Sequence, residues 1–435
     1  MSLYNTLKER NLLYQSTDEE ALKNLLDNGK VTVYCGTDPT ADSLHIGHCV
    51  PCTILRRFQQ AGHKVLILVG GATAAIGDPT GKTDMRPMLS REQLQHNIEG
   101  IKRAYSTFLD FDGNNPAIIV NNADWFAGYD YVNFMRDVGV HFNVNKMITN
   151  EIYAKRMEEG GLTFFEMGYM LMQAYDFLYL NKTYGCNLEW GGADQWGNIV
   201  AGTELGRKMN FLDGKNRQMI GATNPLLLTP EGKKMGKTEK GAIWIEKDKI
   251  SAYDFYQGIY QTPDACVEMM YALFTDIPMN EVRDLIKQDI VKSKKRLAFE
   301  ITKFIRGEAD AIEAEQMSNN LFASNQINKD NAPTFEFEMA DENIGVLDLL
   351  VNAKFVQSKG EARRLIDQNG LSVDGETIKD ATTQISKEDL KNGLLFKKGK
   401  KNYLLIKIKW NLPFSWQFLK LAVNGKKNYV LIKVK

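Results

Sequence analysis

The sequence lacks the features that would place it in a membrane or outside the cell. No apolar run approaches the ~18 residues of a spanning helix. The first twenty residues mix acids and bases and contain neither the apolar core nor the small-residue cleavage site of a signal peptide. Cysteines are few and their spacing is not that of a disulfide framework: Cys35, Cys49, Cys52, Cys186 and Cys266. We therefore expect a cytoplasmic protein with free thiols.

An excess of one charge is also missing. The chain has 54 basic and 54 acidic residues, so the whole molecule carries no footprint for a polyanion. The exception is segment 391–435, which contains twelve Lys and no Asp or Glu. Such a segment either contacts phosphate backbones or only increases solubility. Within it GKKNYLLIKIK (399–409) recurs as GKKNYVLIKVK (425–435). We interpret this as a local duplication that adds a surplus edge strand, because one extra unit cannot form a solenoid.

The first half of the chain shows an α/β rhythm. Strand patterns at 30–35, 65–69, 117–120 and 187–190 alternate with helical stretches such as 45–60. This predicts a doubly wound, Rossmann-like parallel sheet that binds ligands beyond the ends of its strands. Residues 250–320 are helical and charged, and the following polar stretch has no clear strand.

The last part of the chain predicts a small α+β domain. Ser358 and Glu361 have capping-box spacing, and Gly370 is placed to end the helix that they begin. Asp374-Gly375 is a hairpin turn between two short strands. Three basic residues of the helix are candidate RNA contacts, although an ordinary solvated face fits them equally well: Lys359, Arg363 and Arg364.

These patterns predict six segments along the chain. They are a Rossmann-like domain (1–225), a mobile loop and connector (226–245), an α-helical domain (246–322), a linker (323–343), a small RNA-binding domain (344–409) and a duplicated basic tail (410–435).

A histidine motif follows the first of these strands. It runs from Tyr34 to His48, and Ser43 is placed to cap the helix that begins there. His45 and His48 are three residues apart, on one face of a first turn whose free N–H groups and dipole favour phosphate. Gly47 keeps the surface low enough for a planar ring to approach. Alone, two such histidines are more often packing or surface residues.

Two other motifs suggest metal or nucleotide sites that we reject. Cys49-Val-Pro-Cys52 has the redox or zinc spacing, but it is single and lies in an apolar helix, which favours buried packing. The segment from Gly77 to Thr83 has three residues between its glycines, whereas a P-loop needs four.

The stretch 163–180 has a polar stripe on an apolar helix. Tyr169, Gln173 and Asp176 stand at i, i+4 and i+7 and therefore share a face. Such a stripe is either exposed to solvent or satisfied by a ligand.

A basic loop from Gly232 to Thr238 (GKKMGKT) completes the pattern. Together with the histidine motif it resembles the signature of class I aminoacyl-tRNA synthetases. Residues 191–198 (GGADQWGN) and 169–176 (YMLMQAYD) resemble the tyrosyl branch, and the C-terminal module is similar to the S4 RNA-binding domain. The resemblance covers about residues 1–409. The loop reads KMGKT rather than the generic class form, as is frequent in tyrosyl enzymes.

The resemblance implies a pocket for tyrosine. Tyr34 and Asp176 would bind the phenol, Asp78, Tyr169 and Gln173 would hold the ammonium group, and Asn122 would line the same pocket. Buried groups committed to a hydroxyl reject phenylalanine, because its binding leaves them unpaired.

The resemblance also implies the reaction. The tyrosine carboxylate attacks the ATP α-phosphate to give tyrosyl-adenylate, and the tyrosyl group passes to the 3′ end of tRNA(Tyr). Magnesium would arrive with ATP rather than in a protein site. A homodimer is implied, with tRNA across both subunits. The residues expected to act on the phosphates are Thr40, His45, His48, Lys82, Arg86, Lys234, Lys237 and Thr238. Those expected to contact ATP or the adenylate are Cys35, Gly36, Asp38, Gly47, Gly192, Asp194, Gln195 and Lys237.

Three alternatives stay open on the sequence. A small-molecule adenylyltransferase would share the histidine motif but does not explain an S4-like module. An RNA-binding regulator with a silent core is disfavoured by the intact reactive side chains. A tryptophanyl enzyme is distinguished by Tyr34 and Asp176 as phenol partners.

Overall fold

The computed structural model describes residues 2–80, 90–232, 234–235, 237–238, 241–323, 332–339, 341–399 and 402–409, with four short strands beyond residue 415. The chain forms two compact units, residues 1–315 and 316–435. No helix in these described ranges is long and apolar enough to cross a bilayer.

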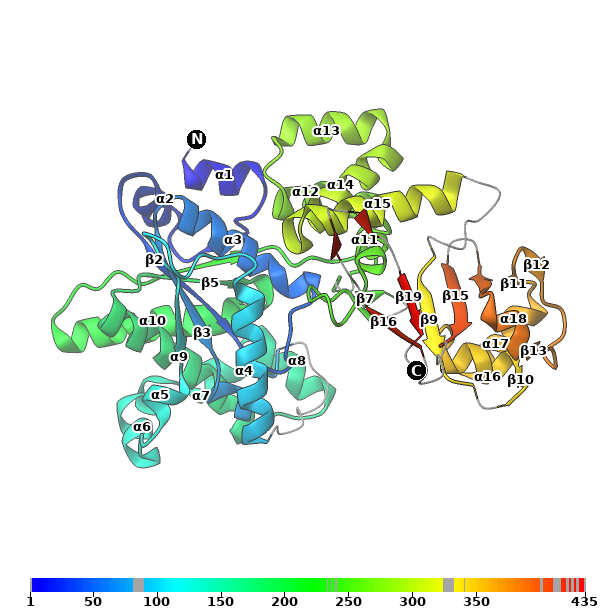
Figure 1. The fold of residues 1–435 in the computed structure, drawn as a ribbon. Coiled ribbons are helices and arrows are strands. Elements are labelled where there is room, and N and C mark those ends of the chain that lie inside the picture. The colour runs from blue at the N-terminus through cyan, green and yellow to red at the C-terminus, as the bar shows by residue number, and fades with distance from the viewer. Residues whose placement is uncertain are drawn as a thin grey trace. The chain divides into compact units, whose positions relative to one another are not determined.

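The first unit is built on a six-stranded sheet in the order β1-β6-β5-β2-β3-β4 (Figure 1). All neighbouring strands are parallel except the pair β1 and β6. The chain leaves β2 toward β3 and β4, then returns to place β5 on the other side of β2. The sheet therefore has its switch point between β2 and β5, where doubly wound folds bind ligands at the carboxyl ends of the strands. The strands are β1 (Gln15–Ser16), β2 (Thr32–Thr37), β3 (Lys64–Val69), β4 (Ile118–Asn121), β5 (Leu188–Gly192) and β6 (Ile220–Asn224).

Helices cover both faces of this sheet, as the apolar composition of its central strands requires. On one face α3 (Cys49–Gln60) packs against Val33 and Cys35 of β2. On the other face Phe177 and Leu180 of α9 (Phe164–Tyr184) pack against Tyr34 and neighbouring strand residues. Thr163 caps α9 through a capping box with Glu166. The sequence-predicted strands and the doubly wound fold are thus confirmed.

Further helices belong to these layers or connect them. They are α1 (Leu3–Glu9), α2 (Glu19–Asn28), η1 (Ile46–His48), η2 (Thr73–Ala75), α4 (Arg91–Tyr105), α5 (Ala123–Phe126), α6 (Tyr131–Asp137), η3 (Gly139–His141), α7 (Val144–Ile148), α8 (Glu151–Glu159), η4 (Ala193–Gln195) and α10 (Trp196–Asp213). The helices after the sheet are α11 (Ala252–Tyr260), η5 (Asp264–Cys266), α12 (Val267–Phe274), α13 (Met279–Gln288), α14 (Ile290–Arg306) and α15 (Glu308–Ala323).

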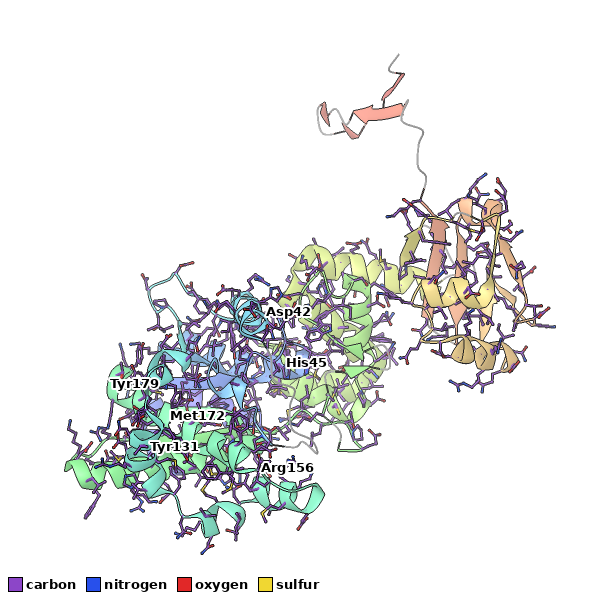
Figure 2. All side chains as sticks on the ribbon, turned by 90° about the horizontal axis from the view of Figure 1, so that it is seen from below. Asp42, His45, Tyr131, Arg156, Met172 and Tyr179 are labelled. Carbon is purple, nitrogen blue, oxygen red and sulfur yellow. The ribbon has the colours of Figure 1, made fainter. Side chains whose placement is uncertain are left out.

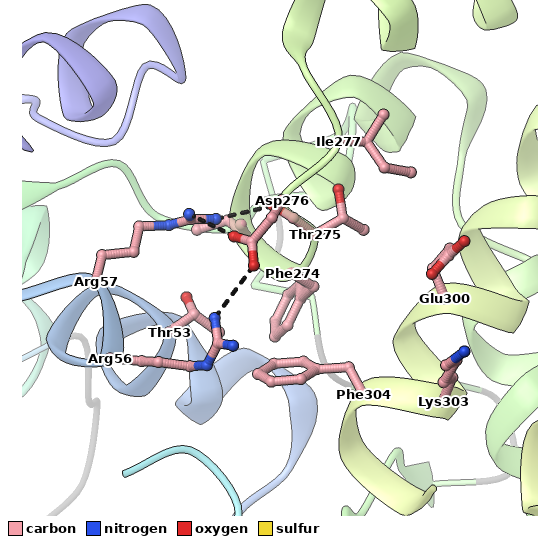
Figure 3. A pocket seen from close by; sticks show the side chains of 11 residues that line it. Thr53, Arg56, Arg57, Phe274, Thr275, Asp276, Ile277, Glu300, Lys303 and Phe304 are labelled. Carbon is pink, nitrogen blue, oxygen red and sulfur yellow. Dashed lines mark hydrogen bonds and ion pairs between the residues drawn. The ribbon is translucent and has the colours of Figure 1, made fainter. Parts of the chain in front are cut away.

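Two buried arginines attach the sheet layers to the end of α12. Arg10 donates to the carbonyls of Tyr271, Ala272 and Thr275 at 3.4, 3.1 and 3.0 Å. Arg57 of α3 donates to two of the same carbonyls and binds Asp276 at 2.8 Å. Cations favour a helix C-terminus because its carbonyls lack partners within the helix. A cavity of about 380 Å³ lies beside this junction, with Arg56, Arg57 and Asp276 among its lining residues (Figure 3).

The second unit contains a five-stranded sheet in the order β12-β11-β14-β15-β9. Asp374 and Gly375 both have positive φ, 47° and 93°, which suits the predicted hairpin turn. Asn369, with φ 53°, takes the left-handed conformation after the preceding helix, where the sequence pointed to Gly370. The elements are β9 (Thr334–Phe337), β10 (Asn343–Gly345), α16 (Val346–Asn352), α17 (Lys359–Asp367), β11 (Leu371–Val373), β12 (Glu376–Thr377), β13 (Gln384–Ser386), α18 (Lys387–Lys391), β14 (Leu394–Lys398) and β15 (Asn402–Ile408).

Strand β9 changes the interpretation of the predicted linker 323–343. It pairs in parallel with β15, from Thr334 opposite Leu405 to Phe337 opposite Ile408. Phe335 and Phe337 pack against the core of this unit. The C-terminal part of the predicted linker is therefore a sheet strand, because apolar residues in its TFEF run find a neighbour that is distant in sequence.

The described strands of the tail pair with one another. They are β16 (Trp416–Leu419) with β19 (Val430–Lys433) and β17 (Ala422–Val423) with β18 (Lys426–Lys427). The tail was expected to add a surplus edge strand, but its described strands form separate two-stranded pairs, and β9 is the edge strand beside β15.

Candidate active site

The candidate site lies at the switch point between β2 and β5. Tyr34 of β2 and Glu189 of β5 are paired in the parallel register, so their side chains leave the sheet on the same face. Both are buried, and Tyr34 packs against Phe177 of α9 with ring centroids 5.4 Å apart. The polar stripe of α9 faces this point from above the sheet.

Asp176 forms the deepest polar group of the stripe. Its side chain is 1% exposed, and its two oxygens accept from Asn122 Nδ2 at 3.1 Å and Trp125 Nε1 at 2.8 Å. Burial raises the pKa of Asp176 well above its usual value. Asn122 is fully buried and also bonds Ala72 and Thr73, so it supports Asp176 from behind.

The hydroxyl of Tyr34 is an unsatisfied group. It is buried and faces the Glu189 carboxylate, but it makes no hydrogen bond of good geometry within the described part of the chain. Burial raises the pKa of Tyr34, and the carboxylates of Glu189 and Asp176 raise it further. A buried hydroxyl without a partner costs free energy, so its position suits a ligand that supplies one.

Tyr169 has its proton committed within the protein. Its hydroxyl donates to Asp38 Oδ2 at 3.0 Å, and Thr73 donates to the other oxygen of Asp38 at 2.9 Å. The Tyr169 oxygen therefore keeps only acceptor capacity for a ligand.

Gln173 and Asp78 also offer acceptor oxygens to a ligand. The amide N–H of Gln173 donates to Glu189 Oε1 at 3.0 Å, which leaves its carbonyl oxygen. Asp78 accepts from Gln195 at 2.6 Å and from the Thr80 hydroxyl at 2.6 Å. Three residues predicted to meet an ammonium group thus offer acceptor oxygens, which is the complement that a cation requires.

The two histidines of the motif stack on one another. Their ring centroids are 3.6 Å apart, with 22° between the planes. The helix cap is His45, whose Nδ1 accepts from Gly47 N at 3.2 Å, and not Ser43 as the sequence suggested. Ser43 is buried and donates to the carbonyl of Leu44. The first turn of this segment is a 3₁₀ turn (η1) that leads into α3.

The basic loop lies against the histidine motif. A Cβ on Gly47 would come within 2.5 Å of the Met235 carbonyl, so only glycine permits this approach. The segment after the loop pairs with the motif, since Ile46 N bonds Ile243 O and Ile245 N bonds Leu44 O. Lys234 forms an ion pair with Asp194 at 2.5 Å.

The remaining candidate residues differ in burial and in the elements on which they lie. Cys35 projects to the α3 face of β2, opposite Tyr34, and is almost fully buried. Gly36, Thr40 and His48 are exposed, and Gly192 ends β5. Lys237 and Thr238 form β7, which pairs with β8 (Gly241–Ala242), but only their backbone is described. Lys82 and Arg86 lie outside the described residues. Lys359, Arg363 and Arg364 are exposed on α17.

Cys49 and Cys52 are free and fully buried in α3. Their interpretation as packing residues is confirmed. In the described ranges no cluster of His, Cys, Asp and Glu could hold a metal ion.

Sequence reasoning missed three residues of this network: Thr73, Trp125 and Glu189. Thr73 bridges Asp38 and Asn122, and Trp125 donates to Asp176. Glu189 carried a usable signal, since a lone acid in the buried strand pattern NLEW must be paired or functional. Burial raises the pKa of Glu189 to about 7.

Two family models match the chain in succession. Residues 26–323 match the model described as tRNA synthetases class I (W and Y). Residues 325–406 match the model described as Tyrosine--tRNA ligase SYY-like C-terminal domain.

Individual relatives agree with these models. The chain is 49% identical to the Tyrosine--tRNA ligase of Clostridium kluyveri over 412 residues, which are 94% of this chain and 100% of that protein. It is 46% identical to that of Acetivibrio thermocellus over 413 residues, 94% of this chain and 99% of the relative. A C-terminally truncated mitochondrial tyrosyl-tRNA synthetase of Aspergillus nidulans superposes with a TM-score of 0.64 at 28% identity, covering 74% of this chain and 94% of that one. The chain therefore belongs to the tyrosyl branch of the class I aminoacyl-tRNA synthetases, the ATP-dependent ligases that join tyrosine to its tRNA.

Proposed function

We propose that tyrosine binds along the polar stripe of α9, with its phenol between Tyr34 and Asp176 and its ammonium group among Asp78, Tyr169 and Gln173. This assignment depends on one observation: the hydrogen-bond donors of Tyr169 and Gln173 are already paired within the protein. Tyr169 and Gln173 donate hydrogen bonds to Asp38 and Glu189, which leaves their oxygens as acceptors for a cation. At the other end, an unpaired Tyr34 hydroxyl and a buried carboxylate suit a phenolic O–H.

ATP is proposed to lie beside the histidine motif, with its phosphates near Thr40, His45 and His48. Lys234 would move from Asp194 to the pyrophosphate, together with Lys82, Arg86, Lys237 and Thr238. Asp38, Asp194, Gln195 and the backbone at Cys35, Gly36, Gly47 and Gly192 would contact the nucleoside part. Magnesium would enter with ATP as part of the substrate and offset its charge. The chemistry is then positioning and charge stabilisation of an in-line displacement.

The activation step can be measured alone by the amino-acid-dependent exchange of labelled pyrophosphate into ATP. We expect exchange with tyrosine, much weaker but measurable exchange with phenylalanine at high concentration, and none above background with tryptophan. Exchange with tryptophan would show that the pocket assignment is wrong. Exchange with none of the three would remove the proposed tyrosine and ATP sites together.

A second copy of the chain is the proposed partner of segment 131–165. Seven large apolar side chains in this stretch are exposed, and isolated soluble surfaces rarely concentrate such groups. They belong to α6, η3, α7, α8 and the start of α9, where Figure 2 labels Tyr131. The seven are Tyr131, Val132, Val140, Val144, Met157, Phe164 and Phe165. The resemblance to dimeric synthetases favours a twofold homodimer through this surface.

Introducing negative charge into segment 131–165 should dissociate the proposed homodimer into single chains. Val140 and Phe164 are 70% and 67% exposed, so Val140→Asp with Phe164→Asp should leave the fold of one chain intact. We expect the mass measured by light scattering to halve, because burying two carboxylates per copy costs more than the interface returns. Phe211→Asp, at a side chain that is 87% exposed outside this segment, is the control and should leave the mass unchanged. An unaltered mass in the double variant would place the partner surface elsewhere.

The transfer RNA is proposed to contact the C-terminal unit through Lys359, Arg363 and Arg364 of α17, with a contribution from the basic segment 391–435. The proposed segment boundaries are 225, 245, 322 and 409, and the RNA-binding part begins with β9 (Thr334–Phe337) rather than after residue 343. A cytoplasmic location follows from the proposed role in protein synthesis.

A further inference from the structure

Glu189 is a buried acid that the assignments above leave without a role. It lies in β5 with 2% of its surface exposed. Oε1 accepts from Gln173 at 3.0 Å, whereas Oε2 makes no hydrogen bond of good geometry in the described part of the chain, although the Tyr34 hydroxyl lies close enough to interact with this carboxylate. A buried carboxylate with one well-formed hydrogen bond destabilises the fold relative to an apolar side chain of similar size. Its presence therefore calls for a functional explanation.

The surroundings of Glu189 make room for the carboxylate without satisfying it. Gly202 of α10 faces Oε2, and a Cβ at that position would lie 3.2 Å from this oxygen. Tyr34 is its partner across the sheet. Strand register and a glycine thus fix the position of the carboxylate. The side chains that it meets, Gln173 and Tyr34, both belong to the proposed tyrosine site.

This bond determines which end of the Gln173 amide meets a ligand. An amide has one donor arm and one acceptor arm, and rotation by 180° exchanges them. Above its pKa of about 7 Glu189 is ionised and can only accept, so it holds the amide nitrogen and turns the carbonyl oxygen away from itself. The opposite orientation would present N–H groups to an ammonium group, and donor would face donor.

We propose that Glu189 is a positioning residue for tyrosine recognition, which orients Gln173 so that its carbonyl oxygen accepts from the substrate ammonium group. This rests on the proposed role of Gln173. Asp38 acts in the same way on Tyr169, whose hydroxyl proton it holds. Asp38 and Glu189 thus accept the donors of Tyr169 and Gln173, so that both side chains present acceptor oxygens to the pocket.

The test compares two inhibitors of pyrophosphate exchange that differ only in the amine: tyrosinol and 3-(4-hydroxyphenyl)propan-1-ol. Neither has a carboxylate, so neither is adenylated. The ratio of their inhibition constants does not depend on the fraction of folded enzyme. In Glu189→Met we expect tyrosinol to bind about 10- to 100-fold more weakly and the amine-free alcohol to change less than about 3-fold. In Glu189→Gln, whose amide oxygen still accepts from Gln173, both constants should stay within about 5-fold of the parent.

Glu189→Asp provides a second route if the Met variant does not fold. It keeps the charge but withdraws the acceptor by one methylene, so the same selective loss should appear, at about 3- to 10-fold. An equal weakening of both inhibitors in the Met and Asp variants, or of neither, would overturn the proposal. So would a further selective loss when Glu189→Met is added to Gln173→Met, because two residues that act through one contact are not additive.

Failure of the underlying assignment gives a different result. If the parent enzyme binds both inhibitors equally, or if Gln173→Met leaves their ratio unchanged, the ammonium site itself is misplaced. Loss of the ratio in Gln173→Met with no change in Glu189→Met rejects the orienting role and retains the site.

Discussion

Asp176→Asn should reduce kcat/KM for tyrosine in pyrophosphate exchange by about 100-fold, because the buried phenol is left without its hydrogen-bond partner. Asn122 and Trp125 each donate to one oxygen of Asp176. An asparagine has a single oxygen, so its NH₂ group must face one of these donors and cannot accept from the phenol. The phenol then loses its acceptor. Activity with phenylalanine, which has no hydroxyl to pair, should change less than about 3-fold. Discrimination between the two amino acids should therefore fall by nearly the same factor as the tyrosine activity.

A loss of both activities by the same factor would contradict this role and indicate a damaged fold. Asp213→Asn, at the end of α10, removes an ion-paired carboxylate outside the site and should change neither activity. Stability provides an independent check. Burial raises the pKa of Asp176, so its protonated form is favoured on folding and its contribution to stability is lost as pH rises from the unfolded value of 3.8. The Asn variant should consequently lose less unfolding free energy than the parent between pH 4 and pH 7.

The parts of the fold that depend on local sequence could be predicted. Apolar runs specified β2 to β5, and the spacing of Ser358 and Glu361 correctly marked Ser358 as the cap at the start of α17. The spacing of Tyr169, Gln173 and Asp176 placed them on one helix face. In the structure, hydrogen bonds through Asp38, Thr73 and Asn122 connect Tyr169 with Asp176, and Gln173 bonds Glu189 beside them. Periodicity decides such features because it follows from helix and strand geometry alone.

Features that depend on distant partners could not be predicted. The TFEF run of β9 is short and follows a polar stretch, and only its pairing with β15, about seventy residues later, makes it a strand. Trp125 gave no sign of a role, because its partner Asp176 is fixed by the packing of α9 over β4 and β2. Ser43 looked like a cap, but the segment 243–245 pairs with residues 44–46 and leaves His45 to cap the turn. Each of these outcomes is decided by tertiary contacts that no local pattern contains.

Family resemblance supplied what the residues alone left open. The stripe on α9 had two equally good explanations on the sequence, exposure to solvent or binding of a ligand. Its donors are paired with Asp38 and Glu189, and its acceptors remain. The interior acids that make this possible, above all Glu189, are visible in the sequence only as single charges in apolar runs.

Lys234→Ala should lower kcat for tyrosine-dependent exchange by about 100- to 1,000-fold, with little change in KM for ATP. A charge that meets the phosphates only in the transition state affects kcat, and loss of one such group costs roughly 3–4 kcal/mol. Lys234 now pairs with Asp194 at 2.5 Å, but its side chain is 61% exposed. An ion pair that exposed contributes about 1 kcal/mol or less, so the loop can leave it when the pyrophosphate forms.

The control is Lys247→Ala, which removes an equally exposed lysine paired with Asp310 outside the loop and should leave kcat unchanged. Quenched-flow measurement of tyrosyl-adenylate formation separates the chemical step from product release. A raised KM with normal kcat would show that Lys234 binds ATP in the ground state instead. A several-fold gain in activity would show that the Asp194 pair restrains the loop more than its exposure allows. The expected loss of kcat requires that Lys234 gains more from the pyrophosphate in the transition state than it loses by leaving Asp194. The gain is about 3 kcal/mol and the loss about 1 kcal/mol, so the balance favours the transition state.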